Sequence, residues 1–269
     1  YRANLDGTDV DEILSNVNGT HMAVDPHNER VYWSNGQHLR RSEFDGSNAN
    51  SLLHFSDARS FHGLAFDPAD PGALYYALAS GTIGGVAQIN TDGTGYRVLA
   101  GGGKWFDIAL DSDDSLLLLS TRFVSGNNPR MFRLPTSGFP LSSNSFPNFG
   151  SHSRVAVHSQ SDSLFWTGPS GPGGGDSVWR SNLDGSSAEI ILGRAEDIQV
   201  FGDKLYYAQL ANPNRVDLWR ANLDGSSPEL VVVGSGNMTT FAIIPEPSTL
   251  AMLVFGAFLA AHKKRPAMV

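Results

Sequence analysis

A short Asp-Gly turn recurs along the chain at nearly even spacing, and this repeat constrains the fold more than any other feature. Five copies are intact: Asp6-Gly7, Asp45-Gly46, Asp92-Gly93, Asp184-Gly185 and Asp224-Gly225. In the sixth position Ser137-Gly138 replaces Asp-Gly. The steps between positions 6, 45, 92, 137, 184 and 224 are 39, 47, 45, 47 and 40 residues. A period of 40-odd residues is typical of an array of identical supersecondary units.

Each of these turns is predicted to join two strands. The Asp side chain can bond its own backbone, and Gly supplies the positive φ that closes a tight turn. Runs rich in β-forming residues follow the turns, as at 189–192 and 229–233. Each copy is therefore interpreted as a β-hairpin.

Two further strand patterns lie between the turns. Continuous apolar and aromatic runs occur at 31–34, 74–77, 116–119, 164–167 and 205–208. A second run precedes each of them and has a small central residue in five of six copies, at 22–25, 64–67, 108–111, 155–158, 198–201 and 241–243. Small residues there would let innermost strands crowd around an axis. Units of four strands at this period are propeller blades.

The expected fold is all-β, a six-bladed β-propeller over residues 1–243. Five full blades are predicted at 20–54, 61–99, 105–149, 153–192 and 196–233. The leftover strands, about 1–14 and about 239–243, are expected to pair with one another and share the sixth blade. Tyr1 falls in the middle of a repeat, so the N-terminus is expected to be truncated or processed, with one strand of that blade just upstream.

Three recurring motifs resemble a known repeat family. Met22-Ala23-Val24-Asp25, Val31-Tyr32-Trp33-Ser34 and Arg2-Ala3-Asn4-Leu5-Asp6-Gly7 resemble the class B repeats of the low-density lipoprotein receptor, called YWTD repeats, which form six-bladed propellers. The resemblance covers about residues 1–243 and is weakest around 112–150. The fourth letter of the motif is never kept, since Asn35, Leu78, Ser120, Gly168 and Gln209 stand there. Functions that the family performs through that Asp are therefore not implied.

The last part of the chain, residues 244–269, differs abruptly in composition. Pro245-Glu246-Pro247 breaks any strand. Residues 250–261 are apolar all round, which favours a short hydrophobic helix over an amphipathic helix packed on the domain. Such a helix would reach only about 18 Å, short of the roughly 30 Å hydrocarbon core. The basic residues Lys263, Lys264 and Arg265 predict a cytoplasmic C-terminus.

This order of Pro-Glu-Pro, apolar segment and basic end resembles the PEP-CTERM sorting signal of Gram-negative bacteria that have an exosortase. The resemblance implies exosortase as a partner of the tail, with recognition at Pro245, Glu246 and Pro247. It also implies transient contact with the inner membrane through 248–262, removal of the tail, and delivery to the cell surface or extracellular matrix. The tail is expected to be separable from the fold, so deleting 245–269 should leave the melting temperature within a few degrees.

Composition and motifs exclude several function classes. The net charge of −8 and pI near 5.4 argue against nucleic acid as a partner. The chain has no Cys, which excludes disulfides, Cys-zinc sites and Cys nucleophiles. It contains no HExxH, GxSxG or Walker motif. Asp111-Ser112-Asp113-Asp114 is interpreted as a solvated turn and Gly173-Gly174-Gly175 as a flexible loop, so no metal or cofactor is expected.

The candidate binding site lies at one mouth of the predicted channel. Long connections at 79–85, 121–129, 168–176 and 209–214 should emerge on the face where the innermost strands begin. Aligning the repeats places polar and aromatic side chains at that level, and the ligand-binding candidates are His21, His62, Trp105, Asp107, Arg154, Glu196 and Asp197. The alternative is a set of ion pairs that neutralise one another, with water.

Three functions compete. The prediction is a non-enzymatic, exported propeller that binds a glycan or protein partner, such as an exopolysaccharide or a surface protein, with Trp105 stacking on a sugar ring. The overall negative charge disfavours a polyanionic partner. The alternative is a hydrolase or lactonase with a metal at the mouth, which Arg154 beside the carboxylates Asp107, Glu196 and Asp197 disfavours. A purely structural spacer is the third possibility.

Overall fold

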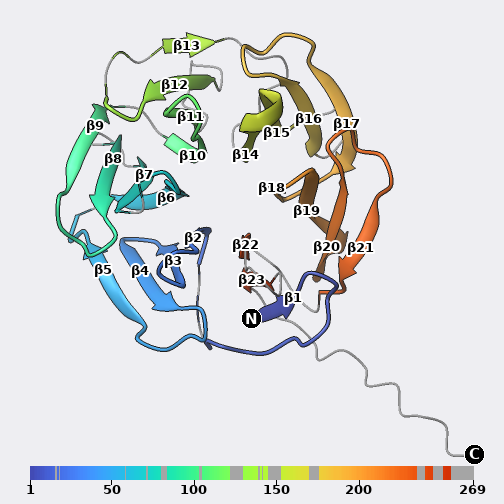
Figure 1. Ribbon diagram of the computed structural model, residues 1–269, viewed down its shortest axis with the longest axis horizontal. Helices are drawn as coiled ribbons and strands as arrows, with labels where there is room; N and C mark the ends of the chain where they lie inside the picture. Colours follow the sequence, from blue (N-terminus) through green and yellow to red (C-terminus); the bar gives the residue numbers. More distant parts are fainter. Residues whose placement is uncertain are drawn as a thin grey trace, which may run out of the picture.

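Strands arranged radially around a central axis make up the computed structural model (Figure 1). The structure describes residues 1–15, 17, 19–57, 59–70, 72–79, 84–102, 105–121, 130–138, 140, 142–144, 153–169, 176–234, 240–244 and 251–255. Within these ranges the only helical element is one 3-10 turn, η1 (Ser159–Ser161). No helix in the described ranges has the length and apolar character needed to cross a bilayer. The predicted all-β class is confirmed.

Five sheets each contain four antiparallel strands in sequence order, so each is one blade. The first blade consists of β2 (His21–Asp25), β3 (Arg30–Asn35), β4 (His38–Glu43) and β5 (Asn50–His54). The second consists of β6 (Ser60–Phe66), β7 (Ala73–Ala79), β8 (Gly85–Asn90) and β9 (Arg97–Gly101). The third consists of β10 (Trp105–Asp111), β11 (Leu116–Thr121), β12 (Met131–Pro135) and β13 (Ser142–Asn144).

The fourth blade consists of β14 (Val155–His158), β15 (Ser163–Pro169), β16 (Asp176–Asn182) and β17 (Glu189–Arg194). The fifth consists of β18 (Asp197–Phe201), β19 (Lys204–Asn212), β20 (Arg215–Asn222) and β21 (Glu229–Val232). In every blade the first strand is innermost and the fourth lies at the rim (Figure 1).

A smaller sheet lies in the ring between the fifth and first blades (Figure 1). This closing sheet has three strands, in the order β1 (Arg2–Asn4), β23 (Ala251–Phe255) and β22 (Thr240–Ile244). The chain thus forms five four-stranded blades, and the predicted six blades are wrong because the described residues form only three strands in this position.

The predicted C-terminal hydrophobic helix is also wrong, because residues 251–255 form the strand β23. Met252 pairs with Ala3 on one side and with Ile243 on the other. The predicted direct pairing of β22 with the N-terminal segment is therefore wrong, because β23 lies between them. The physical reason is that β1 and β22 offer two open strand edges, whose free backbone groups pair with an apolar segment of the same chain.

The hydrophobic core is distributed between blades. Small side chains at the centres of the innermost strands, including Ala23, Ala65 and Ala109, are buried where the strands approach the axis. Large aromatic residues from the second strands fill the spaces between neighbouring sheets, and Tyr32, Tyr76 and Trp166 are fully buried there. Each blade therefore depends on its neighbour for the burial of its apolar surface.

The Asp-Gly turns contact the neighbouring sheet directly. Gly46 has φ of 82°, and a Cβ at this position would lie 2.2 Å from the carbonyl oxygen of Ile13. Gly225 makes the same approach to Ile191, at 2.2 Å, and a Cβ on Gly7 would meet the carbonyl of Val231. Only glycine satisfies both the positive φ and this close packing.

An arginine four residues before most of these turns reaches the next sheet around the ring. Arg41 Nη1 donates to the carbonyl of Thr91 at 2.6 Å. Hydrogen bonds from Ser186 lower the pKa of Asp184, and the charge of Arg133 lowers it further. The charge of Arg220 likewise contributes to the lowered pKa of Asp6, and the charge of Arg2 contributes to the lowered pKa of Asp45. The N-terminal turn therefore belongs to the same ring of contacts as the turns of the blades.

Candidate binding site at the channel mouth

The innermost strands surround a cavity of about 330 Å³ that runs along the ring axis. At the end where these strands finish, it is lined by Pro26, Pro68 and Phe201. At the end where they begin, its lining is polar and consists of His21, Asp107, Arg154, Asp197 and Thr240. This mouth thus brings together side chains from β2, β10, β18 and β22, and that of Arg154, which lies just before β14.

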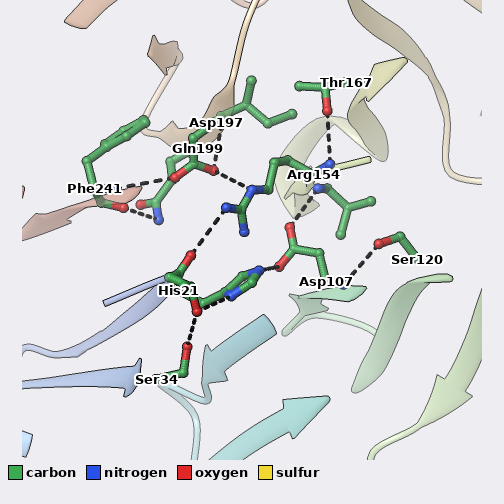
Figure 2. A network of polar contacts seen from close by, with 12 residues as sticks. His21, Ser34, Asp107, Ser120, Arg154, Thr167, Asp197, Gln199 and Phe241 are labelled. Atoms are coloured by element: carbon green, nitrogen blue, oxygen red, sulfur yellow. Dashed lines mark hydrogen bonds and ion pairs between the residues drawn. The ribbon is translucent and has the colours of Figure 1, made fainter. Parts of the chain in front are cut away.

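Arg154 lies among the buried side chains of this mouth, as Figure 2 shows. Its Nε is 3.6 Å from Oδ1 of Asp197, and its Nη2 donates to the carbonyl of Thr20 at 3.2 Å. Asp197 also accepts the backbone N–H groups of Ile198 (3.0 Å) and Phe241 (3.4 Å). The Arg154–Asp197 pair therefore links β2, β14, β18 and β22 across the channel.

Asp107 is a second buried carboxylate at the mouth. Its Oδ2 accepts the backbone N–H of Val155 at 3.0 Å, and its own N–H donates to Ser120 Oγ at 3.0 Å. Burial raises the pKa of Asp107 to about 7, although the charge of Arg154 opposes this shift. Burial also raises the pKa of Asp197, again against the charge of Arg154. Asp107 therefore titrates near neutral pH.

His21 is 4% exposed and completes the buried cluster. Burial, and then the charges of Arg154 and His62, lower its pKa well below the ordinary value, so His21 is neutral at pH 7. Its Nδ1 lies 3.3 Å from Thr20 Oγ1. Its Nε2 lies 3.9 Å from Asp107 Oδ1 and makes no hydrogen bond to the described residues.

The donor set at the mouth does not fit a divalent metal. The guanidinium of Arg154 lies beside Asp197 and close enough to Asp107 to oppose its pKa shift, so a cation already balances one carboxylate. In the described part of the chain, no three His, Cys, Asp or Glu side chains are grouped to hold a metal ion. A divalent ion needs several oxygen ligands, and the carboxylate of Asp197 is already paired with the guanidinium of Arg154.

Trp105 does not lie at the mouth. It is 3% exposed and packs between the second and third blades, edge-on to Phe132 at a centroid distance of 5.1 Å, while Nε1 donates to the Gly102 carbonyl at 2.6 Å. The predicted stacking of Trp105 on a sugar ring is therefore wrong. Side chains alternate along a strand, so Trp105 faces the blade interface and its neighbour Phe106 faces elsewhere.

Phe106 is an aromatic residue that the repeat alignment places at this level but that the sequence reasoning did not select as a candidate. It is partly exposed, and its ring centroid lies 5.2 Å from Cζ of Arg154, 5.6 Å from His21 and 5.8 Å from His62. The pairing of β10 shifts register between Trp105 and Asp107, and that of β6 shifts between His62 and Leu64. These two bulges re-aim the side chains at the strand starts. The sequence did offer one signal, the doublet Trp105-Phe106. Successive side chains of a strand point to opposite faces, so the two rings could not both face the same core.

The remaining predicted residues separate into two groups. His62 is partly exposed and lies against His21 at 5.7 Å, so it belongs to the rim of the mouth. Glu196 is exposed just before β18, with its N–H donating to the Ala208 carbonyl, and is not part of the buried cluster. The predicted long connection at 209–214 is mostly strand, because β19 continues to Asn212. Residues 80–83, 122–129 and 170–175 lie outside the described residues, as do Pro245, Glu246, Pro247, Lys263, Lys264 and Arg265.

The ring of radial blades around an axial cavity defines the chain as a β-propeller. Neither a family model nor a curated protein sequence matches the chain. Solved structures do match it. TolB from Agrobacterium tumefaciens is 12% identical with a TM-score of 0.71, covering 94% of this chain and 96% of that one.

Two further propellers show how widely this fold is shared. A YWTD-type propeller from the nidogen/laminin complex is 16% identical with a TM-score of 0.66, covering 80% of each chain. A gluconolactonase from Xanthomonas campestris is 15% identical with a TM-score of 0.65, covering 88% of this chain and 85% of that one. At these identities the likeness establishes the propeller fold alone.

Proposed function

We propose that this chain is a non-catalytic, YWTD-like β-propeller that binds a glycan or protein partner at the channel mouth. The observation that carries the proposal is the buried cluster of His21, Asp107 and Arg154, surrounded by the partly exposed rim residues His62 and Phe106. Binding groups on a rigid scaffold are a common use of propeller faces. The long connections predicted on this face would enlarge the contact surface.

The competing proposal is a metal-dependent hydrolase or lactonase, and the likeness to a gluconolactonase fold favours it. The chemistry of the mouth argues against it, because Arg154 lies where a divalent ion would have to approach Asp197 and Asp107. A carboxylate that is paired with a guanidinium is a poor metal ligand. We therefore propose binding rather than catalysis.

The binding proposal is tested with the full chain on a glycan array and in pull-down from matrix extract. Phe106→Ala and His62→Ala should weaken binding at least about tenfold, because both side chains belong to the rim. Tyr96→Ala is the matched control, since Tyr96 is 45% exposed and lies away from the mouth, between β8 and β9. Equal binding by the parent and both rim variants would refute the site.

The export proposal rests on the order of Pro245-Glu246-Pro247, apolar segment and basic end. We propose that residues 244–269 direct the propeller to an exosortase, which removes them before the protein reaches the surface or matrix of a Gram-negative cell. Because β23 is paired on both sides, processing would require this strand to leave the closing sheet.

Expression in an exosortase-bearing strain tests this. The wild-type chain should lose its tail and appear at the surface, whereas Pro245→Ala with Pro247→Ala should keep the tail. A strain without exosortase is the control, and identical processing in both strains would contradict the proposal.

A further inference from the structure

We infer that the channel mouth takes a lysine side chain from a protein partner, with the ammonium group bridging His21 Nε2 and Asp107 Oδ1. The inference rests on the proposed function, which places binding at this mouth, and it narrows the partner to a protein that presents a lysine. Three observations carry it: an unfilled hydrogen-bond geometry, an incomplete charge balance and the depth of the acceptors.

The hydrogen-bond geometry comes first. His21 Nε2 and Asp107 Oδ1 are 3.9 Å apart, which is too far for a hydrogen bond between them. When His21 donates from Nδ1 to Thr20 Oγ1, the buried Nε2 keeps a lone pair that has no hydrogen-bond partner among the described residues, and His21 lines the cavity. Two acceptors at this separation suit one donor nitrogen placed about 2.9 Å from each. An ammonium group has three N–H donors and no acceptor, so it can satisfy both.

The charge balance at the mouth indicates that the ligand is positively charged. The titratable and charged groups that line the mouth with Asp107 are His21 from β2, Arg154 beside β14 and Asp197 from β18, while β22 contributes the neutral Thr240. His62 from β6 lies against His21. Arg154 balances Asp197 at 3.6 Å, and His21 is neutral. An ionised Asp107 therefore lacks a cation of its own, and a buried unpaired charge is costly.

The depth of the acceptors selects lysine among cationic groups. The side chains of Asp107 and His21 are only 11% and 5% exposed. A hexosamine carries its ammonium directly on a wide ring, whereas a lysine ammonium ends a thin chain of four methylenes. That chain can reach a recessed carboxylate while its methylenes lie against Phe106 and His62, which are partly exposed at the rim.

A titration of the full chain with Nα-acetyl-lysinamide, followed by NMR of the histidine rings, tests the inference. The resonances of His21 and His62 should shift saturably. Nα-acetyl-norleucinamide, which has the same aliphatic chain without the ammonium, should leave them unchanged. Affinity for lysinamide should fall as pH is lowered from 8 to 6, because protonation of Asp107 removes the charge that the ammonium pairs with.

Variants complete the test. Asp107→Asn should weaken lysinamide binding more than about tenfold, because it removes one partner of a desolvated charge pair. Asp203→Asn is the matched control, since that carboxylate is 91% exposed beyond β18. If Asp107→Asn does not fold, the pH dependence of lysinamide binding by the wild-type chain tests the inference instead. Equal shifts with norleucinamide, a stronger response to glucosamine or pH-independent binding would overturn the inference. If the lysine inference fails but binding to matrix extract still depends on Phe106, the proposed function is retained without a lysine ligand. If matrix binding does not depend on Phe106, the lysine inference and the proposed function are both wrong.

Discussion

At the scale of single residues, Asp107 and Arg154 differ in how well their charges are compensated. Arg154 has Asp197 within 3.6 Å and the Thr20 carbonyl within 3.2 Å. Asp107 accepts the backbone N–H of Val155 and lies 3.9 Å from the neutral His21, and the charge of Arg154 only partly opposes the pKa shift that burial causes. Its burial therefore costs free energy at neutral pH, which is typical of a group retained for binding rather than for stability.

Asp107→Asn should stabilise the protein at pH 8. The folded-state pKa of Asp107, about 7, lies above the ordinary 3.8, so the folded protein holds this proton more tightly. The contribution of Asp107 to the free energy of unfolding is thus fully present below about pH 4 and is lost as pH rises through 7. The loss is at most about 4 kcal/mol. Asn keeps an acceptor for Val155 N–H, so the variant should melt several degrees higher at pH 8.

The comparison across pH provides the control for this prediction. The advantage of the Asn variant should shrink steadily between pH 7 and pH 4, because the carboxyl is protonated in the folded protein at low pH. A variant that melts lower than the parent at both pH 8 and pH 4 would show that Asp107 stabilises the fold through its charge. Thermal melts at four pH values suffice.

Trp105→Ala should lower the free energy of unfolding by about 3–5 kcal/mol, because it leaves a cavity between the second and third blades. Trp105→Phe should cost less, since it keeps most of the packing and removes only the hydrogen bond to Gly102. Chemical denaturation measures both. At temperatures where the Phe variant is folded, it should bind partners as the parent does. Loss of binding by the folded Phe variant would show that Trp105 is part of the binding site.

The sequence was informative about the mouth only in part. Aligning the repeats correctly brought His21, Asp107, Arg154 and Asp197 to one level, because strand starts are fixed by the period. It placed Trp105 there too, since alignment gives the height of a residue along the axis but not the direction of its side chain. That direction depends on the bulge between Trp105 and Asp107, and the doublet Trp105-Phe106 does not say which of its two rings faces the axis.

At the scale of elements, the Asp-Gly turns fix how neighbouring sheets approach. Gly46→Ala should be strongly destabilising, by more than about 2 kcal/mol, because its Cβ would meet the Ile13 carbonyl at 2.2 Å and its φ is 82°. Gly36→Ala is the control, since φ is 56° there and nothing lies within 4 Å. It should cost only about 1 kcal/mol. Equal losses in denaturant melts would mean that residues 1–14 do not pack on the first blade.

The strand β23 provides a second test at this scale. Leu253→Pro should lower the melting temperature by several degrees, because proline removes a backbone N–H donor from β23, which is paired with β1 on one side and β22 on the other. Ala260→Pro, five residues after the end of β23 in the sequence, is the control. This result would reverse the expectation that the tail is separable from the fold. Unchanged melting of the Leu253 variant would support separability.

The repeat period predicted the blades well because each blade carries its own turn, aromatic strand and small-centred strand. The closing sheet escaped prediction for a physical reason. Whether an apolar run such as 251–255 becomes helix or strand depends on the partners available to it, and both partners, β1 and β22, are distant in sequence. The cross-sheet arginines were also missed, although five of them stand four residues before their turns: Arg2, Arg41, Arg133, Arg180 and Arg220. In the second blade Gln88 takes that place and Arg97 makes the contact instead.

At the scale of the whole molecule, closure of the ring can be tested covalently. The chain has no native cysteine, so Ala3→Cys with Met252→Cys introduces one possible pair across β1 and β23, where the two residues are direct partners. Oxidation should give a disulfide within one chain and raise the melting temperature by several degrees, since the bond closes a very long loop. Disulfides between two chains, or none, would contradict the closing sheet; either single-cysteine variant is the control.

The pairing of the two chain ends also determines how the molecule responds to a mechanical load. β1 and β23 are antiparallel, with Arg2 opposite Leu253 and Asn4 opposite Ala251. A pull applied at the N-terminal end of β1 and the C-terminal end of β23 therefore acts on the same end of the ladder. The bonds are loaded one after another, as in peeling, rather than together in shear. Tethered by both ends, the propeller should give way at this seam at low force, while the five complete blades stay folded.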